Sequence, residues 1–309
     1  FMSMAACDKV NLTEVAKVRN QLAGSQTAEG GPSGGGAGDI IKNIIPDTNM
    51  PVPPLVVNGV GEAAYLWEVG LRTPENNDQV IEIFKRLKEA ARDDKEYGAR
   101  ANELENEWKL NTLQVEKPST PAAAFPGGGI AVYTGYFRII PTEGVLASIL
   151  GHEMAHLLSQ HHLQRWNRAA AAALLDIGPK ITSGERLDKM DPKVIGPVLG
   201  AMGIGYIIGE DLPLERGKEL EADCSGLILA AKAGYNPIEA EQFWHNQDDL
   251  ATKNNSNDSF QLFKLHPAAK DRYSHISKTC LAAAQTAFNQ VDAGKRQNEP
   301  VEFPKSKVS

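Results

Sequence analysis

Apolar residues recur every three or four positions over long parts of this 309-residue chain, and this spacing predicts a mainly helical fold. Between residues 61 and 110 the periodic apolar positions alternate with acidic and basic ones, which indicates helices with one solvated face. Later helices are predicted over residues 167–177, 193–208, 215–233, 237–250 and 267–289.

A short stretch before the middle of the chain breaks this pattern and predicts strands instead. Residues 113–116 alternate between apolar and polar, and residues 122–134 are mostly apolar without helical spacing. The Phe-Pro-Gly-Gly-Gly run at residues 125–129 predicts a tight turn inside the second stretch. The fold class is therefore α+β, mainly helical, with a small sheet or hairpin.

The two ends of the sequence differ in composition from the centre. Residues 24–38 are rich in Gly and Ser, which predicts a flexible tether, and the prolines within residues 39–58 favour an extended arm. We therefore expect a leader, tether and arm over residues 1–58, one domain over residues 59–292, and a disordered tail over residues 293–309.

The net charge of −7 comes from 32 Lys and Arg against 39 Asp and Glu, and no basic stripe is present to neutralise phosphates. Nucleic acid is therefore not expected as a partner. The longest apolar run, residues 194–208, is shorter than the roughly 20 residues that a membrane span needs and contains Pro197 and four glycines. A tightly packed buried helix is the simpler interpretation.

Three cysteines leave two questions open. Cys7 follows Met-Ala-Ala, which resembles the end of a bacterial lipoprotein signal, so it is either a lipid-anchored residue or an ordinary cysteine near a terminus. Cys224 and Cys280 are either a disulfide pair in an oxidising compartment or two buried free thiols.

The pentapeptide His-Glu-Met-Ala-His at residues 152–156 carries the candidate chemistry. A helix turns by about 100° per residue, so His152 and His156 lie on one face and can direct two imidazoles at one metal ion. Glu153 lies beside them, where a carboxylate can take a proton from a water molecule.

A third metal ligand is expected on a second helix. In the sequence Glu-Leu-Glu-Ala-Asp at residues 219–223, Glu219 and Asp223 share a face, whereas Glu221 points about 200° away from Glu219. Glu219 is then a candidate ligand, and Asp223 a candidate acceptor for the free N–H of a ligating histidine. The alternative interpretation is an acidic, solvated helix face.

Several ordered motifs resemble one family. The segments carrying the likeness are residues 151–156, 216–223, 233–237 and 125–135, followed by His266-Pro267 and Arg272. Together they resemble the HtpX, BepA and Oma-type zinc metallopeptidases, the gluzincins of peptidase family M48. The likeness runs from about residue 111 to residue 276, and departs from the family where Pro-Ala-Ala-Ala-Phe at residues 121–125 replaces a common Asn-Ala-Phe.

The resemblance implies a zincin-type domain with one Zn²⁺. It makes His152, His156 and Glu219 the zinc ligands, Glu153 the general base, and Asp223 the partner of a ligating histidine. It also points to His266, as a fourth ligand or an oxyanion donor, and to Arg272, which either stabilises the transition state or ties the last helix to the core. His161 and His162 lie off the ligand face at helical spacing, and we interpret them as polar residues at the helix end.

The expected function is a zinc metalloendopeptidase that cleaves unfolded or misfolded polypeptides, with its substrate extended along an edge strand at Ile130, Ala131, Val132, Tyr133 and Thr134. By resemblance it would face the periplasm of a bacterial envelope and contact the membrane only through a lipid on Cys7. Two alternatives remain: a chaperone-like zinc protein without catalysis, and a latent protease blocked by His266 or by the arm at residues 39–58. The sequence leaves the oligomeric state open.

Overall fold

The computed structural model describes residues 54–115, 121–162, 216–254, 269–291 and 294–302. Cys7, the tether, His266 and the helices predicted over residues 167–177 and 193–208 lie outside the described residues. No helix in the described ranges has both the length and the hydrophobicity to cross a bilayer.

A small mixed sheet lies near the start of the described chain. It contains β1 (Thr73–Glu75), β2 (Lys109–Gln114), β3 (Ala122–Phe125) and β4 (Gly129–Tyr133), in the order β1-β2-β4-β3. Strand β2 pairs with β4 in parallel, while β1 with β2 and β3 with β4 are antiparallel. The α+β, mainly helical class predicted from the sequence is thereby confirmed.

The prediction that residues 130–134 form an edge strand is wrong. Strand β4, which covers Ile130 to Tyr133, pairs with β2 on one side and β3 on the other, and Thr134 begins a 3₁₀-helix (Thr134–Arg138). Within the described chain the sheet ends at β3 instead. The short apolar run resembles an edge from sequence, but burial of all five β4 residues marks an inner strand.

The turn between β3 and β4 depends on glycine. Gly127 and Gly128 have φ values of +90° and +92°, which side chains with a Cβ rarely adopt, and the Gly128 N–H donates to the Phe125 carbonyl at 3.2 Å. The tight turn expected from the Pro-Gly-Gly-Gly run is therefore present.

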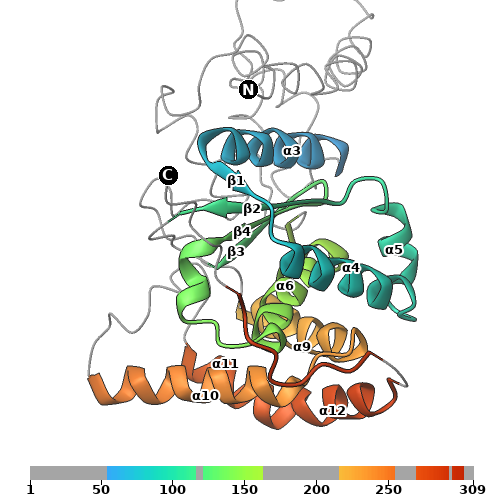
Figure 1. Cartoon of the computed structure of the whole chain (residues 1–309). Coiled ribbons are helices and arrows are strands. Elements are labelled where there is room, and N and C mark those ends of the chain that lie inside the picture. Colours follow the sequence, from blue (N-terminus) through green and yellow to red (C-terminus); the bar gives the residue numbers. More distant parts are fainter. Residues whose placement is uncertain (1–53, 116–120, 163–215, 255–268, 292–293, 303–309) are drawn as a thin grey trace, which may run out of the picture.

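Helices cover both faces of the sheet (Figure 1). Helix α3 (Pro54–Leu71) lies on one face, and α4 (Asp78–Arg92) and α6 (Glu143–Leu158) lie on the other, with α5 (Gly98–Glu103) following α4. Helix α4 shows the expected amphipathic pattern. Asn77 caps its first turn by accepting from the Val80 N–H at 3.0 Å, and its buried stripe is formed by Val80, Ile83, Phe84, Leu87 and Ala91.

The remaining helices form a layer against α6. Helix α9 (Arg216–Lys232) packs most extensively on α6, and it is followed by α10 (Pro237–Asn254) and α11 (Ala269–His275). A π-helical segment (Ile276–Cys280) then leads into α12 (Leu281–Asn289). Helices α6 and α9 therefore form the centre of the domain, with the sheet on one side and α10–α12 on the other (Figure 1).

Two predictions for the ends of the domain need correction. Residues 54–58, expected to end an extended arm, form the first turns of α3, because proline fits the first position of a helix, where its missing N–H is not needed. Residues 294–302, expected to be disordered, pack against the domain: the Glu299 carbonyl accepts from the Glu143 N–H at 2.8 Å, Arg296 pairs with Glu143, and Val301 is buried.

Candidate metal centre

Helix α6 carries the His-Glu-x-x-His segment through the interior. It begins at a Thr142 cap, whose hydroxyl accepts from the Val145 N–H at 3.5 Å, and all sixteen of its residues are buried. A helix that is enclosed on every side cannot turn its polar residues to bulk water. His152, Glu153 and His156 must therefore find partners inside the protein.

Two glycines let α6 and α9 approach closely. A Cβ on Gly226 would lie 2.3 Å from the His152 backbone nitrogen, and one on Gly151 would lie 2.5 Å from the Gly226 carbonyl oxygen. The backbones are therefore in direct contact beside His152. This crossing brings the side chains of residues 219–223 up to those of residues 152–156.

His152, His156 and Glu219 meet in one buried cluster. The two Nε2 atoms are 3.0 Å apart, Glu219 Oε2 lies 3.4 Å from His152 Nε2, and Glu219 Oε1 lies 3.6 Å from His156 Nε2. Each residue offers one ligand atom to a common point. Glu219, chosen over Glu221 by the family resemblance, is thus the carboxylate that reaches both histidines.

The donor set fits zinc. Two imidazole nitrogens and a carboxylate oxygen, with a fourth position left for water or substrate, are a common ligand set of catalytic zinc sites, and tetrahedral bonds of about 2.0–2.2 Å place such donors about 3.3–3.6 Å apart. The two separations that involve Glu219, 3.4 and 3.6 Å, fall in that range, and the 3.0 Å between the two imidazole nitrogens lies just below it.

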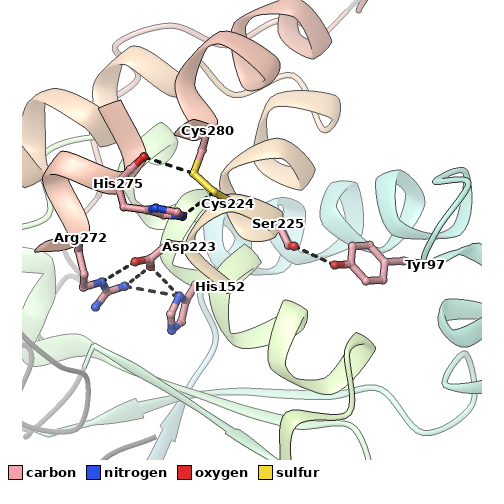
Figure 2. The surroundings of a disulfide bond; sticks show 8 residues. All are labelled: Tyr97, His152, Asp223, Cys224, Ser225, Arg272, His275 and Cys280. Carbon is pink, nitrogen blue, oxygen red and sulfur yellow. Dashed lines mark hydrogen bonds and ion pairs between the residues drawn. A yellow bond between two sulfur atoms is a disulfide. The ribbon is translucent and has the colours of Figure 1, made fainter. Parts of the chain in front are cut away.

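Asp223 and Arg272 lie next to His152, on the side of its Nδ1 atom (Figure 2). Asp223 Oδ1 is 2.9 Å from His152 Nδ1, and Arg272 donates from Nε to Asp223 Oδ2 at 2.8 Å and from Nη2 to Oδ1. The guanidinium also lies 4.5 Å from the ring centre of Trp244 on α10. Arg272 thus ties α11 to the core, which is the second of the two roles considered for it, whereas direct transition-state stabilisation stays a prediction.

This arrangement fixes the charges around His152. Burial alone would lower the pKa of His152, but its contacts with Asp223 and Glu219 outweigh burial and raise that pKa to about 9. Burial raises the pKa of Asp223, yet the charge of Arg272 and the contact with His152 together hold it below its ordinary value. Asp223 is therefore a permanent carboxylate, suited to accept the Nδ1–H of His152 and leave Nε2 directed at the cluster.

Glu153, next to His152 in the chain, contacts the sheet. Its Oε2 accepts a hydrogen bond from the Ala124 N–H of β3 at 2.9 Å. Because that N–H serves Glu153, it is directed away from β4 and toward α6. The residue that directly follows the candidate ligand His152 therefore has its carboxylate at the β3 edge of the sheet.

The placement of His161 and His162 differs from the sequence interpretation. Both are buried, and His161 Nδ1 lies 2.9 Å from His156 Nδ1. Helix α6 ends before them, and Gln160 has a φ of +54°, so the chain turns back instead of continuing around the helix. Burial lowers the pKa of His162 to about 4. Sequence reasoning missed the His156–His161 contact because no motif marks Gln160 as a turn.

A disulfide joins Cys224 and Cys280, which decides between the two alternatives for these residues. It connects α9 to the π-helical segment, and His275 Nε2 lies 3.3 Å from Cys224 Sγ (Figure 2). Because Cys224 follows Asp223 directly, the disulfide anchors the part of α9 that contacts His152.

A sequence model of Peptidase family M48 matches residues 77–280, which is more than half of the chain and includes every described residue of the cluster. The chain belongs to peptidase family M48. This family is zinc-dependent, in agreement with the donor set of His152, His156 and Glu219.

Curated proteins similar to this M48 chain carry two kinds of name. It is 25% identical over 227 residues to "Mitochondrial metalloendopeptidase OMA1" of Saccharomyces cerevisiae, covering 71% of this chain and 60% of the yeast protein. It is 25% identical over 174 residues to the human "Metalloendopeptidase OMA1, mitochondrial", covering 55% of this chain and 32% of the human protein. It is 30% identical over 120 residues to "Beta-barrel assembly-enhancing protease" of Yersinia pestis, covering 38% of this chain and 24% of that protein. The chain thus spans 60% or less of the length of these three relatives.

Proposed function

We propose that this M48 chain is a zinc metalloendopeptidase, with His152, His156 and Glu219 as the metal ligands and Glu153 as the general base. The observation that carries the proposal is the buried cluster of two imidazoles and one carboxylate next to Glu153, on helices held in backbone contact. Zinc bound there supplies Lewis acidity, which lowers the pKa of a water molecule and polarises a carbonyl group.

Glu153 is placed to move the proton that peptide hydrolysis requires. It takes a proton from the attacking water and then delivers it to the leaving amine nitrogen. Its hydrogen bond from the Ala124 N–H holds the carboxylate in a fixed orientation for this transfer. A purely structural zinc site needs no such base, and this argues against the chaperone-like alternative.

The substrate is proposed to lie along β3 rather than β4. Within the described chain β3 has a neighbour strand on one side only, and its Ala124 N–H is directed toward Glu153. An extended peptide can add itself there as a further strand and place its scissile carbonyl near the cluster. Main-chain pairing of this kind tolerates many sequences, so unfolded or misfolded polypeptides are the proposed substrates.

An oxidising compartment is proposed for this protein, because a disulfide persists only where thiols are not kept reduced. The relatives' names divide between mitochondria and β-barrel assembly, and the bacterial envelope remains our proposal. The lipid on Cys7 and blockage of the site by His266 stay predictions, since neither residue is among those described.

The test uses Glu153→Gln and Glu219→Ala beside the unchanged chain. Glu153→Gln should keep one zinc per chain and lose cleavage of unfolded casein by at least 10²-fold, because general acid–base catalysis contributes about 10²–10⁴-fold. Glu219→Ala should lose both stoichiometric zinc and cleavage. Elemental analysis and a fluorescent casein assay measure the two properties. Full activity of pure Glu153→Gln would show that another group is the base.

A further inference from the structure

The imidazole of His156 has a partner on the side that faces away from His152 and Glu219. Its Nε2 lies 3.0 Å from His152 Nε2 inside the cluster, while its Nδ1 lies 2.9 Å from His161 Nδ1 outside it. His161 is only 2% exposed, and its other ring nitrogen, Nε2, lies 3.3 Å from Glu221 Oε1 on α9.

Only one placement of the hydrogens satisfies this line of contacts while His156 offers Nε2 to a metal. A ligating Nε2 carries no hydrogen, so the hydrogen of His156 is on Nδ1 and is donated to His161 Nδ1. His161 then carries its own hydrogen on Nε2 and donates it to the Glu221 carboxylate. Each contact holds one hydrogen, and the line ends at a group that only accepts.

The same helix supplies the corresponding partner for the other histidine. Asp223 Oδ1 lies 2.9 Å from His152 Nδ1, so each ligating histidine has a carboxylate from α9 behind it, directly for His152 and through one imidazole for His156. Of the three acidic residues of α9, Glu219 belongs to the cluster itself. Asp223 contacts the Nδ1 side of His152, and Glu221 contacts His161, which lies on the Nδ1 side of His156.

We propose that His161 and Glu221 are positioning residues for His156, which fix its tautomer and ring orientation so that Nε2 faces the zinc. This inference rests on the proposed function, because it assumes that His156 is a ligand. Outer partners of this kind typically contribute 10–100-fold to metal affinity. Glu221 has a side chain that is 53% exposed, so solvent weakens its share and His161 carries the larger effect.

The experiment measures how fast the zinc-loaded protein releases zinc to an excess of chelator. His161→Phe keeps a buried aromatic ring but removes the acceptor, and it should release zinc about 10–100-fold faster. His161→Gln, whose side-chain carbonyl can accept from His156, should restore most of the difference. Glu221→Ala should accelerate release by about threefold, a fraction of that effect.

Glu103→Ala is the matched control for Glu221→Ala. Glu103 is also an exposed glutamate in an ion pair, with Arg100 at 2.8 Å, but it lies on α5 and has no described contact with the cluster. Its release rate should equal that of the unchanged chain.

A second measurement needs no substitution. A long-range ¹H–¹⁵N spectrum of the zinc-loaded protein should show hydrogens on His156 Nδ1 and His161 Nε2. A hydrogen on His161 Nδ1, or an unchanged release rate in folded His161→Phe, would overturn the inference, and the spectrum decides the matter if His161→Phe does not fold. A chain that binds no zinc would defeat the proposed function instead, whereas zinc binding and casein cleavage with either of the contrary results would defeat this inference alone.

Discussion

Replacing Gly226 by alanine should separate the two helices that carry the metal ligands. The new Cβ would lie 2.3 Å from the His152 backbone nitrogen, whereas ordinary contacts begin near 3.4 Å. The difference, 3.4 minus 2.3, requires a local shift of about 1.1 Å. The position of the Cβ is fixed by the Gly226 backbone and the His152 nitrogen is itself a backbone atom, so no side-chain rotation can relieve the contact.

The shift is large relative to what a zinc site tolerates, because ligand distances are held within about 0.2 Å. Glu219 lies on the moving helix and His152 on the other, so Gly226→Ala should weaken zinc binding by at least 10-fold. Overpacking of this kind also typically costs about 1–3 kcal/mol of stability. Competition with a fluorescent chelator measures the affinity, and urea unfolding of the metal-free protein measures the stability.

Gly217→Ala is the control on the same helix. A Cβ on Gly217 meets no atom within 4 Å, so this variant should bind zinc normally and gain up to about 1 kcal/mol from the better helix propensity of alanine. If Gly226→Ala bound zinc as tightly as Gly217→Ala, the close crossing of α6 and α9 would not be what sets the ligand geometry.

Two further predictions concern the disulfide and pH. The Cys224–Cys280 disulfide spans 56 positions, and loop-closure entropy for such a span is about 4 kcal/mol. The double variant Cys224→Ala/Cys280→Ala should therefore be less stable by about that amount in urea unfolding, and equal stability would contradict the estimate. Because the pKa of His152 is raised to about 9, zinc must displace a proton from it at neutral pH. Chelator competition should show zinc affinity falling about tenfold per unit from pH 9 to pH 7, and a flat profile over that range would contradict the raised pKa.

The sequence predicts what depends on local periodicity. The apolar stripe of α4 and the glycine turn at residues 127–128 follow from side-chain spacing and backbone freedom, and both are present in the fold. The same reasoning placed His152 and His156 on one face, because four residues make about one helical turn.

Features that depend on three-dimensional pairing could not be predicted in this way. The order of the strands in the sheet decides whether β3 or β4 is an edge strand. The residues of each strand do not reveal which other strands lie beside it. The role of His161 depends on the left-handed backbone at Gln160, a conformation that no local signal required. The ordered segment at residues 294–302 depends on partners such as Gln79 and Glu143, which are far away in the sequence.

That last segment has a consequence for how the protein is made. Gln79 donates to the Pro300 carbonyl across 221 positions, and Arg296 reaches Glu143 at the start of α6 across 153 positions. A ribosome that has just released α6 has not yet synthesised the residues that hold its first turn. A nascent chain therefore completes the contacts at the start of α6 only after residues 294–302 have been synthesised, late in translation.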